Sequence, residues 1–170
     1  YDDYDFGFDD LTDHGGGKIY NFMTKPYVDI RGMNGRRKLT MYLPYWSDEK
    51  RNDNSQIFYW NGWTNLYNLH IIVANARYGI HIEHIQCDDS EMFMDNCIVE
   101  YAYININMEW WRNSADALGC GAYNNQRVRC TNSKFIGIGS GFAMHSRTMQ
   151  TPYPCTWEFE NCEFKGEYSD

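Results

Sequence analysis

Apolar and polar residues alternate along short runs of the chain, and these runs predict β-strands. In the stretch 91–107, Met92 and Met94 alternate with polar neighbours, Asn96 follows, and Val99 comes three residues after that asparagine. A second alternating run over 103–107 closes the unit. A period of two is the pattern of strands, not of a helix. The stretch therefore predicts short strands joined at an asparagine corner.

The same pattern occurs four times, and each copy has an apolar residue three positions after an asparagine. The spacings between these asparagines are 28, 36 and 29 residues. Repeats of this length without a helical period predict a β-solenoid, in which each coil buries its apolar face against the next. Stacked coils lie about 4.8 Å apart, so the asparagines can form a ladder at a shared corner. The four asparagines are Asn68, Asn96, Asn132 and Asn161.

We therefore predict an all-β protein that folds as a β-solenoid, that is, a β-helix. The alternative is an all-β sandwich in which the repeated pattern arises by chance. Residues 1–14 hold six Asp among aromatic residues and predict a separate acidic segment. We expect residues 15–170 to form the β-helix domain and, because the first residue is not Met, the chain to be a piece of a longer polypeptide.

Charge and hydropathy narrow the range of partners. The 170 residues carry 15 Lys and Arg against 23 Asp and Glu, a net charge of −8. Nucleic-acid affinity depends largely on neutralising phosphates, so we expect no nucleic-acid partner. No apolar run approaches the length of a membrane span, and we expect no membrane insertion.

Six cysteines are present, and their positions favour buried free thiols. Cys97 and Cys162 directly follow the corner asparagine of their repeats, whereas Cys130 falls on an inward-facing strand position. Buried thiols behave as small apolar side chains. The chain has no C-x-x-C motif, so we expect no zinc site and no other cofactor.

Several motifs together resemble a known superfamily. The residues are GGGKIY at 15–20, YVDIRG at 27–32, WNGWTNLYNLHI at 60–71 and ENCEF at 160–164. They are similar to motifs of the pectate-lyase-like right-handed parallel β-helix superfamily, over about residues 15–166. Its members include polysaccharide lyases, glycoside hydrolases, epimerases and bacteriophage tailspikes. The resemblance implies that the solenoid is a right-handed, single-stranded parallel β-helix with a glycan-facing surface, but it does not choose among these roles.

The long third repeat predicts a loop with exposed aromatic rings. Its extra residues fall between Met108 and Arg127 and include Trp110 and Trp111. Insertions in solenoids often lie on the binding face. Adjacent strand residues point in opposite directions, so one of these two tryptophans should face outward. Aromatic faces stack on sugar rings or anchor protein interfaces, which makes both residues candidate contacts to a polysaccharide.

In each repeat a second alternating run follows the asparagine corner. Alignment of these second runs predicts a polar surface with two carboxylates. The alignment places His81 beside Asn105 and Ala143, Glu83 beside Asn107 and His145, and Glu109 beside Arg147. Glu83 and Glu109 would then lie roughly 8 Å apart, given the strand spacings of a sheet. That separation suits an inverting glycosidase, in which one carboxyl acts as acid and the other activates water.

The remaining polar residues of this surface are candidates for complementary roles. His145 and Arg147 could polarise a sugar carboxylate, as a lyase requires. His81, Asn105 and Asn107 are the candidate sugar contacts. The alternative is a face that is polar only because it is solvated. The motif set of polygalacturonases is represented only by Asp88-Asp89, so the reaction stays open between a lyase and a hydrolase.

These observations favour a virion protein of the tailspike or tail-fibre type that recognises a host-surface polysaccharide. Whether it also depolymerises the glycan is left open. One alternative is a secreted, extracellular bacterial polysaccharide lyase or glycoside hydrolase, and another is a purely structural solenoid. The tailspike resemblance also implies a homotrimer.

Overall fold

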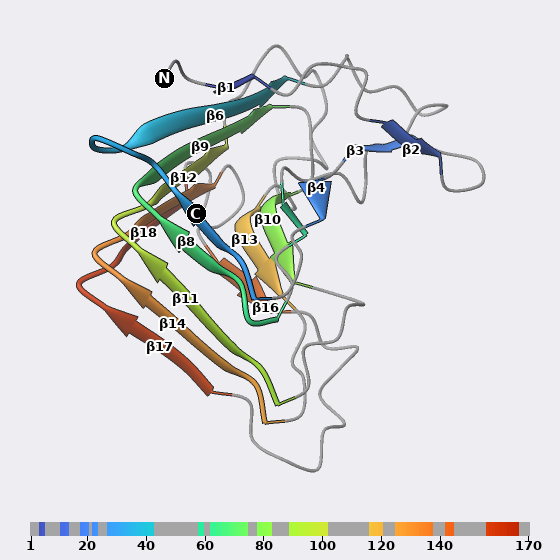
Figure 1. The fold of residues 1–170 in the computed structure, drawn as a ribbon. Coiled ribbons are helices and arrows are strands. Elements are labelled where there is room, and N and C mark those ends of the chain that lie inside the picture. Colours follow the sequence, from blue (N-terminus) through green and yellow to red (C-terminus); the bar gives the residue numbers. More distant parts are fainter. Residues whose placement is uncertain are drawn as a thin grey trace.

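The computed structural model (Figure 1) describes part of the chain, and the structural statements below concern that part. Its backbone is described over residues 4–5, 11–13, 18–20, 22–23, 27–42, 58–59, 62–74, 78–82, 89–101, 116–120, 125–137, 142–144 and 156–166. Side chains are described over residues 27–41, 62–73, 79–81, 89–100, 125–137 and 156–166.

The described residues form strands and turns, with no helix among them. No long apolar helix that could cross a bilayer occurs in this part of the chain. The strands are β1 (Tyr4–Asp5), β2 (Leu11–Asp13), β3 (Lys18–Tyr20), β4 (Phe22–Met23), β5 (Asp29–Arg31), β6 (Arg37–Tyr42), β7 (Phe58–Tyr59), β8 (Asn65–Tyr67), β9 (Leu69–Ala74), β10 (Tyr78–Ile82), β11 (Glu91–Asp95), β12 (Ile98–Tyr101), β13 (Asp116–Cys120), β14 (Arg127–Thr131), β15 (Lys134–Gly137), β16 (Phe142–Met144), β17 (Thr156–Glu160) and β18 (Glu163–Gly166).

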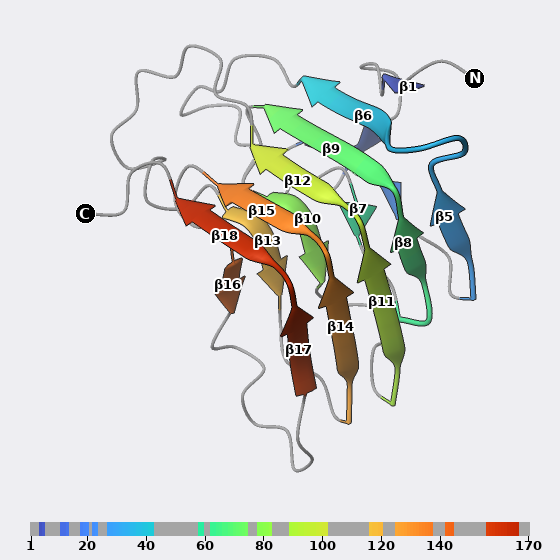
Figure 2. The same ribbon diagram turned by 90° about the vertical axis from the view of Figure 1, so that its left-hand side faces the viewer.

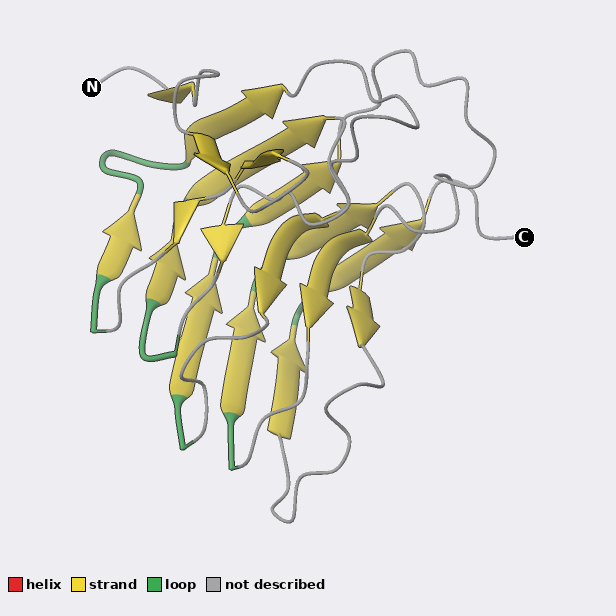
Figure 3. Ribbon diagram, turned by 90° about the vertical axis from the view of Figure 1, so that its right-hand side faces the viewer, coloured by secondary structure: helices red, strands yellow, loops and turns green. Residues whose placement is uncertain are grey.

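Three parallel sheets make up the body of the molecule (Figures 2 and 3). Sheet 1 contains β4, β7, β10, β13 and β16; sheet 2 contains β5, β8, β11, β14 and β17; sheet 3 contains β1, β6, β9, β12, β15 and β18. From β4 onward the chain visits sheets 1, 2 and 3 in turn. Five coils result, from coil 1 (β4, β5, β6) to coil 5 (β16, β17, β18). The predicted fold, an all-β right-handed parallel β-helix, is confirmed.

A single asparagine forms the corner between sheets 2 and 3 in four of the coils. The φ angles are positive at all four residues: Asn68 (54°), Asn96 (52°), Asn132 (51°) and Asn161 (53°). Asparagine tolerates this left-handed conformation better than most L-residues, because its short polar side chain can hydrogen-bond locally. Only one or two residues separate the strands at these corners, so the chain enters the next sheet without a longer loop, and the predicted asparagine column is confirmed.

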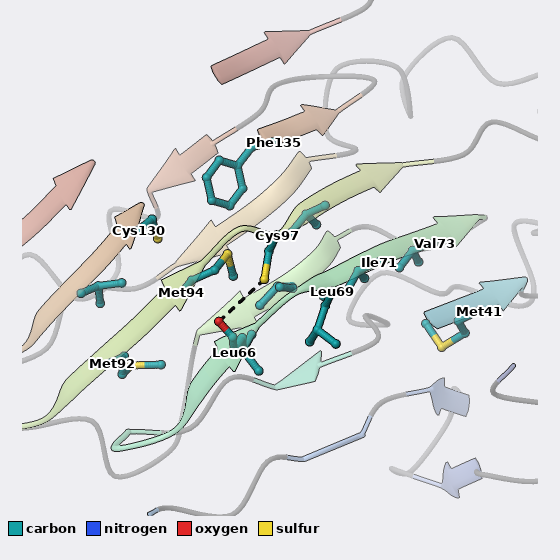
Figure 4. Close-up of a cluster of buried hydrophobic side chains, with 13 residues drawn as sticks. Met41, Leu66, Leu69, Ile71, Val73, Met92, Met94, Cys97, Cys130 and Phe135 are labelled. Atoms are coloured by element: carbon teal, nitrogen blue, oxygen red, sulfur yellow. Dashed lines mark hydrogen bonds between the residues drawn. The ribbon is translucent and has the colours of Figure 1, made fainter. Parts of the chain in front are cut away.

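The predicted apolar positions form columns inside the solenoid (Figure 4). The residues three positions after each corner asparagine are consecutive partners in sheet 3, namely Ile71, Val99, Phe135 and Phe164. Leu39 of coil 1 pairs with Ile71 and extends this column. A second column in sheet 2 contains Ile30, Leu66, Met94, Cys130 and Phe159. In the middle coils these side chains are fully buried. Each such burial contributes about 1.5–3 kcal/mol, so the stacked columns are the main source of stability.

Two of the cysteines, Cys97 and Cys162, directly follow a corner asparagine, and Cys130 lies on β14. Cys97 and Cys130 are fully buried, and Cys162 is half-buried in coil 5. The Cys97 thiol donates to the carbonyl oxygens of Asp95 (3.3 Å) and Leu66 (3.7 Å). Cys162 repeats this arrangement with Glu160 (3.5 Å) and Cys130 (3.3 Å). The expectation of buried free thiols is confirmed for Cys97 and Cys130.

Short strands of the acidic N-terminal segment join the fold. β1 pairs in parallel with β6, at Leu39 and Thr40, and so covers part of the N-terminal edge of sheet 3. β2 pairs in antiparallel fashion with β3, which lies in the GGGKIY motif. Both strand pairs join a residue range before the predicted boundary at residues 14 and 15 to one after it. The boundary stays a prediction.

Candidate functional site

The outer face of sheet 2 is the surface on which the structure describes the most polar and aromatic side chains. Its strands β5, β8, β11, β14 and β17 lie side by side in chain order (Figure 2). Inward residues alternate with outward ones, as in β11, where Met92 and Met94 are buried and Glu91 is exposed. Because the strands follow this period of two, outward side chains of successive coils align in columns across the face.

A second left-handed corner bounds sheet 2 at the start of its strands. In four coils, the residue two positions before the strand has a positive φ angle: Tyr27 (63°), Trp63 (64°), Asp89 (57°) and Asn125 (51°). Sheet 2 is thus held between two columns of left-handed residues. Aromatic and β-sheet-forming residues are uncommon in this conformation, which costs roughly 1–3 kcal/mol per residue. Tyr27 and Trp63 are therefore held in place by the surrounding coils rather than by local preference.

Tyr27 and Trp63 form an exposed aromatic stack at this corner. Their ring centroids lie 5.7 Å apart with 19° between the ring planes. Tyr27 is 78 % exposed and Trp63 is 36 % exposed. Backbone hydrogen bonds fix both residues, since Tyr27 N–H donates to Trp63 O (3.0 Å) and Trp63 N–H donates to Glu91 O (3.1 Å). We call these two residues the aromatic platform.

Hydrogen-bonding side chains follow the platform on the outer face. Asp29 accepts hydrogen bonds from the Asn65 amide (2.8 Å) and from the Arg31 guanidinium (2.7 Å). The hydrogen bond from Arg31, followed by that from Asn65, lowers the pKa of Asp29 below its ordinary value. The Asn65 side-chain oxygen in turn accepts from the backbone N–H of Phe93 (3.1 Å). Asp29 is therefore an ionised acceptor whose position is fixed by two partners.

More aromatic rings continue the outer face beyond these polar residues. The Arg31 guanidinium lies 3.8 Å from the centroid of the Tyr67 ring, a cation–π contact. Tyr67 and Phe93 are neighbours, with ring centroids 5.7 Å apart and 57° between their planes. The first three coils therefore present aromatic and hydrogen-bonding groups side by side, an arrangement suited to a ligand with both apolar faces and hydroxyl groups.

The last two coils carry a different surface, made of ion pairs. Arg127 binds both carboxylate oxygens of Glu158 (3.0 and 3.1 Å), and Arg129 binds Glu160 (2.8 Å). The side chains of these four residues are 40–68 % exposed, and such pairs contribute little to stability. No group of three or more His, Cys, Asp or Glu residues that could hold a metal ion occurs in the described part.

The residues predicted from the sequence as site residues fall mainly outside the described part. His81 is the exception: it lies in β10, and its side chain is 1 % exposed. The neighbouring Ile80 belongs to the apolar core, so the alternation of a strand places His81 on the opposite face of β10, where it is nevertheless buried. A sugar contact needs an accessible side chain, and the role of His81 stays a prediction. The following residues lie outside the described part, and their roles stay predictions: Glu83, Asn105, Asn107, Glu109, Trp110, Trp111, His145 and Arg147.

The strand alignment behind the predicted carboxylate pair is wrong. β10 pairs with β13, so the neighbour of His81 is Gly119 and not Asn105. Gly119 in turn pairs with Ala143, as predicted for the next coil. The third strand of this repeat is thus 116–120 rather than 103–107, and the extra residues precede it, between β12 and β13. The separation of roughly 8 Å between Glu83 and Glu109 loses its basis with this register.

Sequence reasoning missed the aromatic platform as a unit. The members of this corner column differ in chemistry, so no repeated residue type marks it. The signal that could have revealed it is the constant offset of two residues before each strand of sheet 2. Once the strands are aligned, Tyr27, Trp63, Asp89 and Asn125 fall at equivalent positions.

Comparison with protein-family models, curated proteins and solved structures gives no match to this chain. The assignment of fold therefore depends on the sheet topology and on the repeat.

Proposed function

We propose that this protein recognises a polysaccharide on a cell surface and that the aromatic platform is a contact site for the sugar. The observation that carries the proposal is the Tyr27–Trp63 stack, which is exposed and adjoins the polar residues Asp29 and Asn65. A sugar ring has apolar C–H faces and hydroxyl groups at its edge. Flat aromatic rings match the faces, and fixed carboxylate and amide groups match the hydroxyls.

Preorganisation supports a binding role for this surface. The platform residues are held in left-handed conformations by backbone hydrogen bonds, and Asp29 is fixed by Asn65 and Arg31. Groups that are already ordered lose less conformational entropy when a ligand binds. A linear glycan that runs from the platform along the outer face of sheet 2 would then meet Tyr67 of coil 2 and Phe93 of coil 3.

The biological setting that we propose is a tailspike- or fibre-like virion protein that attaches to host-surface glycan. Support comes from the resemblance of the GGGKIY, YVDIRG and ENCEF motifs to a superfamily that includes such tailspikes, together with the parallel β-helix fold. In this setting the protein acts at the tail of the virion, as a homotrimer, and cleavage of the glycan would be an additional activity of the same surface.

A glycan-binding assay on the full chain tests the proposal. Binding would be measured on a panel of bacterial surface polysaccharides for the wild type and for the variants Tyr27→Ala, Trp63→Ala and Trp63→Phe. Loss of a stacking ring that contributes about 1.4 kcal/mol weakens binding tenfold. We therefore expect at least a tenfold loss for the two alanine variants and a smaller loss for Trp63→Phe.

Met33→Ala is the matched control, because Met33 is an exposed apolar residue of the same coil outside the platform. Binding should survive this change, and circular dichroism would confirm that each variant folds. Glycan binding that is equal in the wild type and in folded Tyr27→Ala and Trp63→Ala would contradict the platform. No binding to any polysaccharide of the panel would contradict the function itself.

A further inference from the structure

The aromatic platform adjoins a part of the surface whose described charges are negative. The described residues of coils 2 and 3 contain no Lys or Arg, whereas those of coil 3 include Asp89, Glu91, Asp95 and Glu100. The platform joins coils 1 and 2, so coil 3 is its neighbour on the outer face of sheet 2 (Figure 2). Because complementary charge determines which partner a surface accepts, these carboxylates constrain the charge of a ligand at the platform.

Two carboxylates adjoin the platform, and they come from different coils. Asp29 follows Tyr27 by two residues on the same outer face, so their Cα atoms lie at most about 7 Å apart. Glu91 lies in coil 3 beside Trp63, whose backbone N–H donates to the Glu91 carbonyl oxygen (3.1 Å). The Glu91 side chain is exposed and points outward, in alternation with the buried Met92. The platform therefore has a carboxylate on each of two sides.

The positive side chains that adjoin these two carboxylates leave acceptor sites open. Arg31 donates to one oxygen of Asp29 (2.7 Å), and since a carboxylate has about four lone-pair sites, Asp29 can accept further hydrogen bonds. Arg127 is the coil 4 partner of Glu91 in the sheet, but it binds both carboxylate oxygens of Glu158 instead (3.0 and 3.1 Å). Within the described residues, the Glu91 carboxylate forms no hydrogen bond or ion pair. Both carboxylates can therefore accept hydrogen bonds from a ligand.

We propose that the glycan bound at the platform carries a protonated primary amine, as an unacetylated amino sugar does. This inference rests on the proposed function, because it names the class of sugar that the same site takes. The sugar ring stacks on Tyr27 and Trp63, and its ammonium group donates to Asp29 and Glu91. A primary ammonium has three N–H donors and no acceptor, whereas an ionised carboxylate only accepts, so the two groups match. Hydrogen bonds between charged groups are also roughly twice as strong as those between neutral ones.

Sugars of other charge fit this surface less well. A uronic acid would bring its own carboxylate against Asp29 and Glu91, and like charges repel. An N-acetylated sugar keeps the stacking contact but offers the two carboxylates no cation. A quaternary ammonium group has no N–H donor and is recognised by a cage of aromatic faces. The planes of Tyr27 and Trp63 are only 19° apart, so the two rings stack on each other and form no cage.

Titration calorimetry on the full chain tests this class of ligand with three oligosaccharides of equal length, made of glucosamine, of N-acetylglucosamine and of galacturonic acid. In a buffer that keeps the amine protonated, the wild type should bind the glucosamine oligomer at least about tenfold more tightly than the acetylated one. Salt should reduce this preference. Glu91→Gln should lower the ratio of the two affinities by about two- to fivefold, as expected for an exposed ion pair. Asp29→Asn should lower it by about tenfold, because this carboxylate is fixed in place and its loss also leaves Arg31 unpaired.

Glu100→Gln is the matched control, because it removes the same charge from coil 3 but on sheet 3, where Glu100 pairs with His70. Its affinities should equal those of the wild type. Glu91→Gln remains informative if Asp29→Asn fails to fold, since Glu91 is exposed.

The outcomes separate this inference from the proposed function. Equal binding of the glucosamine and acetylated oligomers, or tightest binding of the uronic acid, would overturn the amine; the platform would stand if Trp63→Ala abolishes that binding. A preference for the amine that survives both Asp29→Asn and Glu91→Gln would overturn the assignment of these carboxylates. No binding of the glucosamine oligomer would overturn the inference as well, and failure on the whole panel of polysaccharides would remove the proposed function with it.

Discussion

The side-chain amide of Asn96 donates a hydrogen bond to the side-chain oxygen of Asn68, 2.8 Å away, across two coils of the solenoid. Asn161 donates to Asn132 in the same way, also at 2.8 Å. Between these two pairs, Asn96 and Asn132 do not hydrogen-bond to each other through the bonds described but to other side chains. The guanidinium of Arg36 donates to the side-chain oxygen of Asn96, and the Asn132 amide turns to Asp95 (2.9 Å). The corner column is therefore two asparagine pairs joined through Asp95.

Asn96 contributes to stability in two separable ways, by its backbone conformation and by its amide. In Asn96→Ala the left-handed conformation costs about 1–2 kcal/mol, and the lost hydrogen bonds cost about 0.5–1.5 kcal/mol. We expect a total loss of about 1.5–3.5 kcal/mol in the free energy of unfolding, measured by urea denaturation.

Asn96→Gly is the matched variant, because glycine adopts the left-handed conformation without a steric penalty. It should lose only the side-chain hydrogen bonds and be destabilised by about 1 kcal/mol. Equal stability of the alanine and glycine variants would contradict a backbone contribution at this corner.

Gly32 lies in the turn between β5 and β6 of coil 1, where close packing of the backbone requires a glycine. A Cβ at this position would lie 2.1 Å from the backbone oxygen of Asn68 and 2.8 Å from that of Gly35. Both contacts are with backbone atoms, so no side chain can move aside. We expect Gly32→Ala to lower the free energy of unfolding by about 3 kcal/mol, the upper part of the usual range for overpacking. Met33→Ala, one residue away and exposed, should change stability by less than about 0.5 kcal/mol.

The sequence predicted the parts of the fold that repeat with the same residue types. The asparagine corner returns with the same amide, and the residue three positions later is always apolar, so both columns could be aligned without a structure. These two features determine the register between sheets 2 and 3. They also explain why Cys97 and Cys162, at the same offset from the corner, make the same pair of sulfur–carbonyl contacts.

The strands of sheet 1 could not be aligned in the same way, because no corner residue marks their start. Residues 103–107 alternate between apolar and polar residues and therefore predicted a strand at the expected offset. The strand that pairs with β10 is instead β13, Asp-Ala-Leu-Gly-Cys, whose alternation is weak. Pairing depends on which segment fits the coil after a long insertion, and this is a tertiary effect that periodicity alone does not reveal.

The predicted catalytic pair gives a test that does not depend on the aromatic platform. If the protein hydrolyses its glycan with Glu83 and Glu109 as acid and base, Glu83→Gln or Glu109→Gln should reduce turnover by about 10²–10⁴ and leave binding intact. Release of reducing ends would be measured for hydrolysis, and release of unsaturated products for a lyase. Trp110→Ala and Trp111→Ala should weaken binding rather than turnover. Unchanged turnover in both glutamine variants would remove the pair from the mechanism.

Cys97 gives the protein a specific dependence of stability on alkaline pH. Burial raises the pKa of its thiol to about 12, from an ordinary value of 9.0. The native state therefore keeps the thiol protonated at a pH where the unfolded chain has lost that proton. Since stability falls with pH wherever the native state binds more protons, the contribution of Cys97 is complete below about pH 9 and is lost as the pH rises toward 12.

The change of unfolding free energy with pH that is due to Cys97 can be measured separately with a serine substitution, because another coil has serine at the equivalent position. Ser133 occupies the equivalent position in coil 4, where its hydroxyl donates to the Thr131 carbonyl (2.7 Å). Cys97→Ser should keep a donor at this corner but remove the titration. Between pH 9 and 11 the wild type should therefore lose up to about 1.4 kcal/mol per pH unit more than Cys97→Ser, in urea denaturation followed by circular dichroism. Cys162→Ser, at a half-buried position, is the control. Parallel pH curves for the wild type and Cys97→Ser would mean that the Cys97 thiol ionises as readily in the folded protein as in the unfolded chain.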